Sequence, residues 1–389
     1  MPSAARRARR LRAVRVLVDV SAVPARPVGA GVYTVALVDA LDRRTDVDLH
    51  LAARRDDEHR WHRIAPAAEV HATAPTRRPA RLTWEQTRAP ALAVHIRPDA
   101  WHGPHYTMPL RADVPCVVTV HDMTFFDHPE WHERSKVVFF RRMIRAAARR
   151  AKGVVCVSAY TADRFRALTT PRAQVTVAHH GVDHARFLPG GDETTDRATL
   201  AVYGIEPPYI GFAGTIEPRK NVPALVQAFA RLAVERPDLR LVLAGSDGWG
   251  ARAAREAITR SGVATRIVRP GYVDNGTVPA LFRQAAVVAY PSFEEGFGLP
   301  ALEGLACGAP VVTTAGSALG EVVGDAAVLA PPDDPAGLAD AISRVLDDTA
   351  LRARLQAAGP ARAAQFTWDR CAEQHIEAYA QAAAAGART

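Results

Sequence analysis

Short apolar runs alternate with longer helical segments along this chain, and the whole alternation occurs twice. The first run, residues 14–20, is rich in β-branched side chains and precedes a loop of prolines and glycines and then a helix that ends near Arg43. Such alternation predicts parallel strands joined by crossover helices, which is the doubly wound α/β arrangement. In the first half we expect strands at 14–20, 47–51, 100–101, 114–120, 153–157 and 175–177, and helices at 81–94, 133–151 and 159–168.

The alternation stops at residues 187–208, a segment of Pro, Gly and Asp without a strong apolar period, and then restarts. A chain of 389 residues is long enough for two cores of ordinary size. We therefore predict two Rossmann-like domains, 1–187 and 188–366, that face each other across a deep cleft, and a last helical segment, 367–389, that crosses back to the first domain. In the second half the expected strands are 209–213, 239–244, 266–268, 286–290, 309–313 and 326–329, and the expected helices are 222–235, 278–284, 335–356 and 368–384.

The composition indicates a globular protein, with 48% hydrophobic and 23% charged residues. No apolar run reaches the length of a membrane-spanning helix, and the basic stretch at residues 1–15 lacks the apolar core of a signal peptide. The four cysteines lie far apart, which favours reduced, buried thiols over a disulfide framework or a zinc site. We therefore expect a cytoplasmic protein.

The net charge is +8 and is carried mainly by arginine. A positive field favours acidic partners such as nucleotide diphosphates or anionic lipid surfaces. We expect no nucleic-acid partner, because the chain has no zinc finger, no RNA-binding pattern and no basic stripe with interleaved aromatics. The predicted helix at 134–152 has two interpretations: it packs Phe139, Met143 and Ala147 on a sheet, or its basic and aromatic residues lie on a membrane surface.

The segment 290–312 carries the strongest functional pattern. It leaves a buried strand, turns through Gly296 and Gly298, and enters a helix. Glycines allow a ligand to approach the backbone closely, and the free N–H groups at a helix start attract phosphate. Glu295 then lies in the loop and Glu303 inside the helix, so the two carboxylates can contact different parts of one ligand.

A second pattern, at residues 211–221, also ends a strand and enters a helix. It turns at Gly214 and places Arg219 and Lys220 at the start of the next helix. Arginine binds phosphate oxygens in a bidentate manner and lysine acts as a point charge. At the carboxyl edge of a parallel sheet, this pair is typical of a diphosphate clamp.

The first half offers two weaker patterns. His121 and Asp122 follow a buried strand and are expected to face the cleft, although such a histidine can also be structural, with the aspartate setting its tautomer. The glycine loop at 27–33 is not a dinucleotide fingerprint, because Thr34 stands where the third glycine would fall. A backbone surface for phosphate or for an acceptor fits this loop better.

Taken together, these segments resemble glycosyltransferase family 4, a family of retaining enzymes with GT-B architecture, and within it a His-Asp, mannosyltransferase-like subgroup. In combination with the other motifs, the spacing of seven residues between Glu295 and Glu303 makes the resemblance specific. His179 and His180 depart from the resemblance, since Pro-Asn is usual there, and so does Gly320, where Pro is usual. The segments that match are 29–31, 121–122, 157–158, 181–183, 214–220, 295–303 and 317–324.

The resemblance implies a role for each motif residue. The expected catalytic group is His121 near the reacting carbon, Arg219 and Lys220 on the leaving diphosphate, and Glu295 on the sugar hydroxyls. Asp122, Ser158 and His180 are expected on the acceptor side. Glu303 is assigned to the ribose, and the two glutamates hold two ends of one donor rather than forming an acid–base pair. The expected donor-binding residues are Gly31, Gly214, Tyr272, Val273, Gly296, Phe297, Gly298, Leu299 and Glu303, with Tyr272 and Val273 beside the base.

The implied function is the transfer of a hexose, with mannose as the best candidate, from GDP-mannose or another UDP- or GDP-sugar. The acceptor is a glycan, a lipid-linked sugar or a small molecule, as in polysaccharide biosynthesis. The resemblance also implies that no metal or other cofactor is needed, and that the enzyme can associate with the inner face of the plasma membrane. Two alternatives stay open: a nucleotide-sugar epimerase or hydrolase of the same architecture, and a non-catalytic subunit that binds sugar nucleotides.

Overall fold

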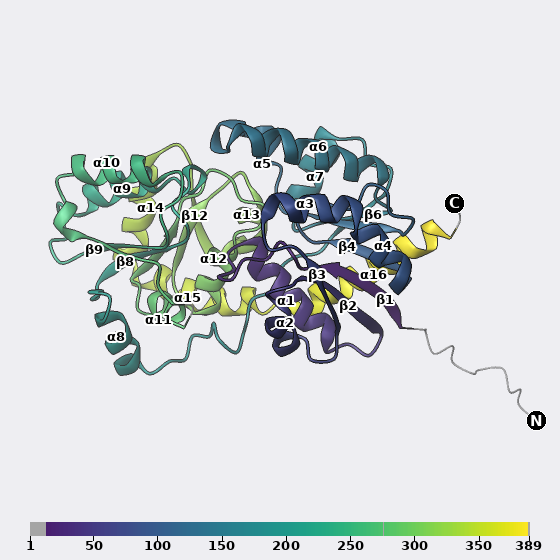
Figure 1. Cartoon of the computed structure of the whole chain (residues 1–389). Coiled ribbons are helices and arrows are strands. Elements are labelled where there is room, and N and C mark those ends of the chain that lie inside the picture. Colours follow the sequence, from purple (N-terminus) through teal and green to yellow (C-terminus); the bar gives the residue numbers. More distant parts are fainter. Residues whose placement is uncertain (1–12, 275, 388–389) are drawn as a thin grey trace, which may run out of the picture.

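The computed structural model describes residues 13–274 and 276–387, which form two α/β halves side by side (Figure 1). Most of the basic stretch at residues 1–15 lies outside the described residues. The first half is built on seven parallel strands in the order β3-β2-β1-β4-β5-β6-β7. These strands are β1 (Val14–Asp19), β2 (Val47–Arg54), β3 (Glu69–Ala74), β4 (Ala100–Gly103), β5 (Cys116–Val120), β6 (Gly153–Cys156) and β7 (Gln174–Val177).

Helices cover both faces of this first sheet. Tyr33, Trp61 and Tyr379 belong to the core on one face, and Trp84 and Phe165 to the core on the other. The helices are α1 (Ala30–Asp42), α2 (Glu58–Ile64), α3 (Arg78–Thr87), α4 (Ala89–Ile96), α5 (Thr124–Asp127), α6 (Arg134–Arg150) and α7 (Ala159–Leu168), with a short 3-10 turn η1 (Pro129–Trp131). Because both faces are covered, the central strands β4, β5 and β6 are buried along their whole length, as in doubly wound sheets.

The second half repeats this plan on six parallel strands in the order β10-β9-β8-β11-β12-β13. The strands are β8 (Tyr209–Ala213), β9 (Arg240–Ala244), β10 (Ile267–Gly271), β11 (Val287–Tyr290), β12 (Val311–Thr314) and β13 (Ala327–Ala330). Its helices are α8 (Glu193–Ala201), α9 (Val222–Leu232), α10 (Ala251–Arg260), α11 (Val278–Arg283), α12 (Leu299–Ala306), α13 (Ala318–Val323), α14 (Pro335–Asp347) and α15 (Thr349–Ala363), with 3-10 turns η2 (Pro218–Lys220), η3 (Ala264–Arg266) and η4 (Gly324–Ala326).

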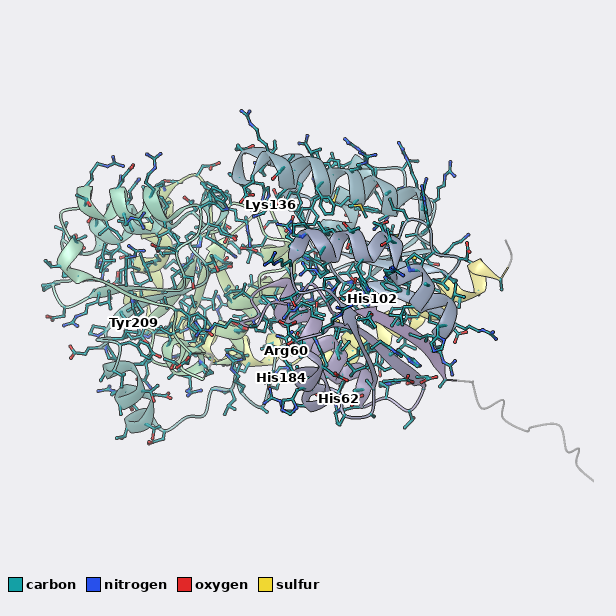
Figure 2. All side chains as sticks on the ribbon, in the orientation of Figure 1. Arg60, His62, His102, Lys136, His184 and Tyr209 are labelled. Atoms are coloured by element: carbon teal, nitrogen blue, oxygen red, sulfur yellow. The ribbon has the colours of Figure 1, made fainter. Side chains whose placement is uncertain are left out.

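The last helix, α16 (Trp368–Gly386), runs from the second half to the first (Figure 1). It packs on α1 and on strands of the first sheet, and it buries Cys371 and Tyr379 in that core. Side chains fill the interior of both halves: His102 of β4 and Tyr209 of β8, labelled in Figure 2, are both fully buried. None of the helices described in residues 13–274 and 276–387 has both the length and the apolar character needed to cross a bilayer.

Three sequence expectations are wrong in detail. The single helix expected at 81–94 is two helices, α3 and α4, because Pro90 in the first turn of α4 has no N–H to continue the first one. The helix expected at 335–356 is also two, because Asp348 ends α14 and its side chain caps α15 through the N–H of Leu351. The segment 187–208 contains α8, which Asp192 caps in the same manner.

Candidate functional site

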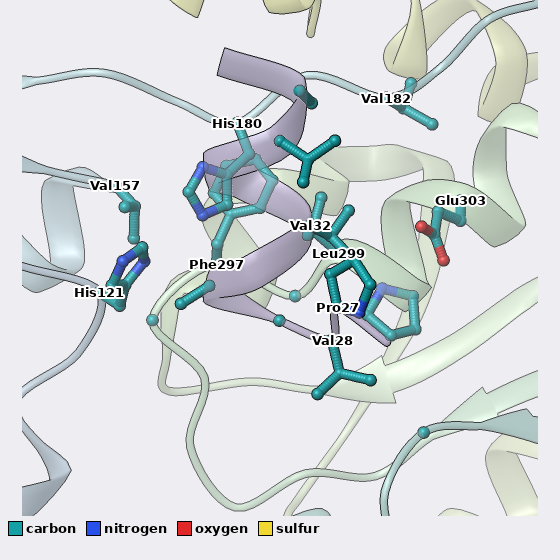
Figure 3. A pocket seen from close by; sticks show the side chains of 18 of the residues that line it. Pro27, Val28, Val32, His121, Val157, His180, Val182, Phe297, Leu299 and Glu303 are labelled. Carbon is teal, nitrogen blue, oxygen red and sulfur yellow. The ribbon is translucent and has the colours of Figure 1, made fainter. Parts of the chain in front are cut away.

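A cleft of about 1130 Å³ lies between the two halves, where the carboxyl ends of their parallel strands face each other. Its lining comes from the loop before α1, the ends of β5, β8 and β11, and the start of α12. This is the expected position for a ligand in open α/β sheets. Figure 3 shows His121 and His180 on one side of the view and Glu303 on the other.

A cluster of charged residues from the second half, which we call the charged wall, is centred on Glu295. Its carboxylate accepts hydrogen bonds from Lys220 and Arg219, one on each oxygen, and from the hydroxyls of Tyr290 at 3.0 Å and Ser292 at 2.9 Å. Lys220 and Glu295 are both buried. The expected catalytic residues of the second half therefore meet as one hydrogen-bonded group in the lining of the cleft.

The protonation states of this wall follow from burial and charge. Burial alone would raise the pKa of Glu295, but the charges of Arg219 and Lys220 outweigh it and lower the pKa to about 2. Burial and the neighbouring Arg219 charge lower the pKa of Lys220 to about 8, although Glu295 opposes that shift. At neutral pH, the carboxylate is ionised and Lys220 is mostly charged but close to titrating.

The glycines after Glu295 allow the two halves to touch. A Cβ atom on Gly296 would lie 1.7 Å from the carbonyl oxygen of His121, so no larger residue fits between the halves there. The carbonyl of Gly296 also accepts a hydrogen bond from Thr161 of α7 at 3.2 Å. Gly298 has φ 99° and immediately precedes α12, a conformation that favours glycine. The start of α12 consequently faces the cleft, which Phe297 and Leu299 line.

The opposite side of the cleft is aromatic, and we call it the aromatic wall: Tyr33, His121, His180 and Trp368. The His180 ring lies 4.7 Å from Tyr33, 5.9 Å from His121 and 5.7 Å from Trp368, measured between centroids. Phe297 of the second half packs against it at 4.8 Å. Four of these five rings line the cleft, and the fifth, Tyr33, is buried and packs against His121, His180 and Trp368.

The histidines of the aromatic wall are neutral at physiological pH. Burial lowers the pKa of His121 and takes that of His180 well below its usual value. The Nε2 atom of His121 donates to the carbonyl of Pro104 at 2.7 Å, and this contact fixes the ring. The Nδ1 atom of His180 is buried and has no hydrogen-bond partner among the described residues.

The remaining expected residues divide into those that line the cleft and those that do not. Asp122, Gly214 and Glu303 line it, and burial raises the pKa of Glu303 to about 7. The Asp122 carboxylate caps the turn at Thr124, with Oδ1 accepting from the hydroxyl at 2.7 Å. Ser158 does not line the cleft, because its side chain caps α7 and accepts from the N–H of Thr161.

Three expected donor contacts lie outside the cleft lining. Gly31 is buried in the first turn of α1, and its N–H donates to the carbonyl of Val28 at 2.9 Å, so Gly29 takes its place in the lining. Val273 is buried in the core of the second half. Tyr272 is 39% exposed and lies under the guanidinium of Arg26, 5.6 Å from the ring centre.

A further contact between the halves was missed in the sequence. Glu321 of α13 accepts the N–H groups of Ala159 and Tyr160 at the start of α7, at 2.9 and 3.0 Å, and accepts from His179 as well. A carboxylate at a helix N-terminus is favoured by hydrogen bonding and by the helix dipole. The only signal in the sequence was the match of 317–324 to the family pattern, which did not identify its partner.

An Asp-x-Asp triplet, Asp46-Val47-Asp48, lies at the start of β2 and does not line the cleft. Asp46 pairs with Arg44 at 3.0 Å and Asp48 with Arg15 at 2.7 Å. Both carboxylates are thus engaged away from the charged wall.

Comparison with known proteins decides the family. Residues 27–186 match the model described as Glycosyltransferase Family 4, and residues 207–348 match that of Glycosyl transferases group 1. O-antigen chain mannosyltransferase B of Escherichia coli is 33% identical over 301 residues, which are 74% of this chain and 78% of that protein. The chain belongs to glycosyltransferase family 4. This family 4 member is therefore an enzyme, a glycosyltransferase, as the resemblance implied.

Solved structures confirm the GT-B fold of this glycosyltransferase. Sucrose-phosphate synthase from Thermosynechococcus elongatus superposes with a TM-score of 0.78 at 22% identity, over 96% of this chain and all of that one (100%). Anabaena HepE in complex with UDP and glucose gives a TM-score of 0.72 at 21% identity, over 94% and 98%. At these identities the likeness concerns the fold: two Rossmann-like domains with a cleft between them.

Proposed function

We propose that this glycosyltransferase transfers mannose from GDP-mannose to a glycan or lipid-linked acceptor, with retention at the anomeric carbon. The observation that carries the proposal is the similarity to the O-antigen chain mannosyltransferase of Escherichia coli over 74% of this chain. The UDP and glucose in the HepE complex support a nucleotide sugar as donor, because that protein shares the fold.

The charged wall supports binding of a donor diphosphate without a metal ion. Arg219 and Lys220 converge on one point of the cleft, where Glu295 orients both side chains. In the proposed complex, the two cations bind the leaving diphosphate and stabilise the charge that develops on it. Backbone N–H groups at the start of α12 bind the same phosphates, and Glu303 contacts the ribose.

The same geometry argues against Glu295 as a nucleophile. Each of its oxygens accepts a hydrogen bond from a cation, and its pKa of about 2 makes it a weak base. We therefore assign Glu295 to cation orientation and to the sugar hydroxyls. Retention then follows from attack on the face that the diphosphate leaves, with a phosphate oxygen taking the proton of the acceptor. His121 lies beside the reacting carbon in this arrangement, and Asp122 and His180 lie toward the acceptor.

A donor panel tests this proposal. Purified protein is incubated with GDP-mannose, UDP-glucose, UDP-galactose and UDP-N-acetylglucosamine, with and without a mannosylated acceptor, and nucleotide release and product mass are measured. We expect the highest kcat/KM with GDP-mannose and release that depends on acceptor. A preference for a UDP-sugar would contradict the donor assignment, and acceptor-independent release with an epimerised sugar would favour the epimerase alternative.

We also propose that α6 associates with the inner face of the plasma membrane. Its apolar stripe, which includes Phe140 and Met143, packs inward, whereas Arg142, Arg145 and Arg149 are exposed. Exposed arginines on one helix face favour anionic lipid, by roughly 1 kcal/mol for each basic residue near the surface. In co-sedimentation, we expect binding to vesicles with phosphatidylglycerol and not to phosphatidylcholine alone, and loss of binding in the R142E/R149E variant. Equal binding of the variant would contradict this assignment.

A further inference from the structure

A cluster of potential metal ligands lies at the edge of the first sheet, outside the cleft lining. It consists of His50 of β2 with Glu69 and His71 of β3, the edge strand. His50 pairs with Glu69 in the parallel register, and His71 follows two residues later. Since successive side chains on a strand alternate between faces, all three lie on the same face. The register of β2 and β3 therefore brings the three side chains together at a place outside the cleft.

The candidate ligand atoms lie at spacings close to those of a tetrahedral site. Nδ1 of His50 is 3.1 Å from Nε2 of His71, and the two rings share a hydrogen bond there without an ion. Nδ1 of His50 is 3.6 Å from Oε2 of Glu69, and Nε2 of His71 is 3.6 Å from Oε1 of the same carboxylate. Zinc binds histidine nitrogen and carboxylate oxygen at about 2.0–2.2 Å in tetrahedral geometry, which places ligand atoms about 3.3–3.5 Å apart. The observed separations match this value within a few tenths of an ångström, and Glu69 lies too far from either histidine for a hydrogen bond.

The surroundings of His50 favour one of its ring nitrogens as the ligand. Oδ1 of Asp48 lies 3.5 Å from Nε2 of His50, which favours the proton on that nitrogen and leaves Nδ1 as the ligand. Arg15 holds the Asp48 carboxylate at 2.7 Å.

Access to the site is open on the side of Glu69. The side chains of His50 and His71 are 9% and 14% exposed, whereas that of Glu69 is 68% exposed. An ion can enter past the carboxylate, bind the two largely buried imidazoles and keep a water molecule as fourth ligand. Histidine ligands select zinc and similar transition metals over Mg²⁺ or Ca²⁺, which prefer sites made only of oxygen atoms.

We propose that His50, Glu69 and His71 bind a divalent transition-metal ion, with Zn²⁺ as the best match, and that the ion fixes the edge strand β3 to β2. The role is structural, because none of the three residues lines the cleft. An edge strand has one unpaired side, so a metal link to its neighbour is a natural means of stabilising it. This inference is independent of the donor and acceptor proposed above.

The test uses full-length, tag-free protein treated with EDTA. Zn²⁺ affinity is measured by competition with a chromogenic chelator, Co²⁺ is added as a spectroscopic probe of tetrahedral geometry, and Mg²⁺ serves as comparison. We expect one saturable Zn²⁺ site per chain, an intense visible Co²⁺ band and a rise in melting temperature with Zn²⁺. In the His71→Ala variant, affinity falls by about tenfold to hundredfold or more.

His62→Ala is the matched control. His62, labelled in Figure 2, lies on α2 beside Glu58, and both side chains are more than half exposed. This variant keeps full Zn²⁺ affinity if the proposal is correct. Glu69→Gln, an exposed change that the fold tolerates, weakens binding and shifts the Co²⁺ spectrum. Absence of saturable Zn²⁺ binding, or equal affinity in the His71→Ala and His62→Ala variants, would overturn the proposal.

Discussion

The two walls of the cleft use opposite chemistry. In the charged wall, Glu295, Arg219 and Lys220 are ionised and paired, so their charges survive burial. In the aromatic wall, burial lowers the pKa of His121 and His180 and keeps both rings neutral, although the carboxylate of Asp122 opposes the shift at His121. Burial disfavours the charged form of side chains in both walls. The ion pairs of Glu295 with Arg219 and Lys220 are what keep the first wall ionised. A diphosphate suits the first wall, whereas the rings and hydroxyls of sugars suit the second.

The largest effect is expected from Glu295→Gln, which breaks the charged wall. The change leaves the buried Lys220 without its carboxylate, whereas the partly buried Arg219 keeps its ion pair with Glu217 at 2.9 Å. Losing one partner of a buried ion pair costs about 3–5 kcal/mol. Urea unfolding at pH 7 measures this loss. Glu294→Gln is the matched control, because burial raises the pKa of Glu294 to about 7 and its charge contributes little. Equal stability of the two variants would contradict the assigned role of Glu295.

In the wild-type protein, acid should remove the stabilisation that the ionised Glu295 provides. The pKa of Glu295 falls from its ordinary value of 4.5 to about 2 in the folded state. Its stabilising effect is therefore full above about pH 4.5 and is lost as pH falls toward 2. The stability gap between the wild-type protein and Glu295→Gln is expected to narrow in urea titrations between pH 5 and pH 3. A constant gap would mean that the pair is not ionic.

Replacing Lys220 with alanine should reduce turnover strongly. The charge-assisted contact to the diphosphate is worth about 1.5–3 kcal/mol, or roughly tenfold to hundredfold in kcat/KM for the donor. Steady-state kinetics with varied donor measure the loss. Lys136→Ala is the control, since Lys136 pairs with Glu133 on α6 at 3.1 Å and does not line the cleft. Comparable kinetics in both variants would show that the charged wall does not contribute to donor binding.

Alkaline pH should weaken donor binding through the same lysine. Burial and Arg219 lower the pKa of Lys220 to about 8, so its charge is lost as pH rises through that value. We expect the donor KM to increase above about pH 8 in the wild-type protein. In Lys220→Arg, the KM stays flat because guanidinium remains charged, even if activity is lower throughout. A flat wild-type profile from pH 7 to 9.5 would contradict this role.

The smallest effect is expected in the aromatic wall. His180 stands where the family usually has Asn, and it is neutral, so His180→Asn removes no charge. We expect a loss of about twofold to tenfold in kcat/KM, the scale of one neutral hydrogen bond, and an unchanged pH profile between pH 5.5 and 7.5. Acceptor kinetics measure it. A wild-type inflection near pH 6.5 that disappears in the variant would show that a charged His180 takes part.

The sequence predicted the parts of the site that depend on local pattern. Strand-end residues such as His121 and Glu295 reach the cleft because parallel strands end at one edge of a sheet. Gly29 lines the cleft in place of the expected Gly31, since local pattern does not say which glycine of the loop faces a ligand. The edge strand β3 was missed because its sequence mixes polar and apolar residues and contains no apolar run.

Contacts between distant segments were beyond any local pattern. The hydroxyl of Tyr33 bonds Nε2 of His375 at 2.7 Å, across 342 positions of the chain. The cap that Glu321 forms on α7 spans 162 positions. Such pairs depend on how the halves and the last helix pack, which periodicity and motif spacing do not encode.

The most direct test of the two-wall account is calorimetric titration of GDP, which lacks the sugar, and of GDP-mannose into three proteins. These are the wild-type protein, Lys220→Ala and His121→Ala. We expect Lys220→Ala to lose affinity for both ligands, whereas His121→Ala binds GDP normally and loses only the added affinity of the sugar. If His121→Ala weakens GDP itself, or Lys220→Ala leaves GDP binding intact, the division between a diphosphate wall and a sugar wall is wrong.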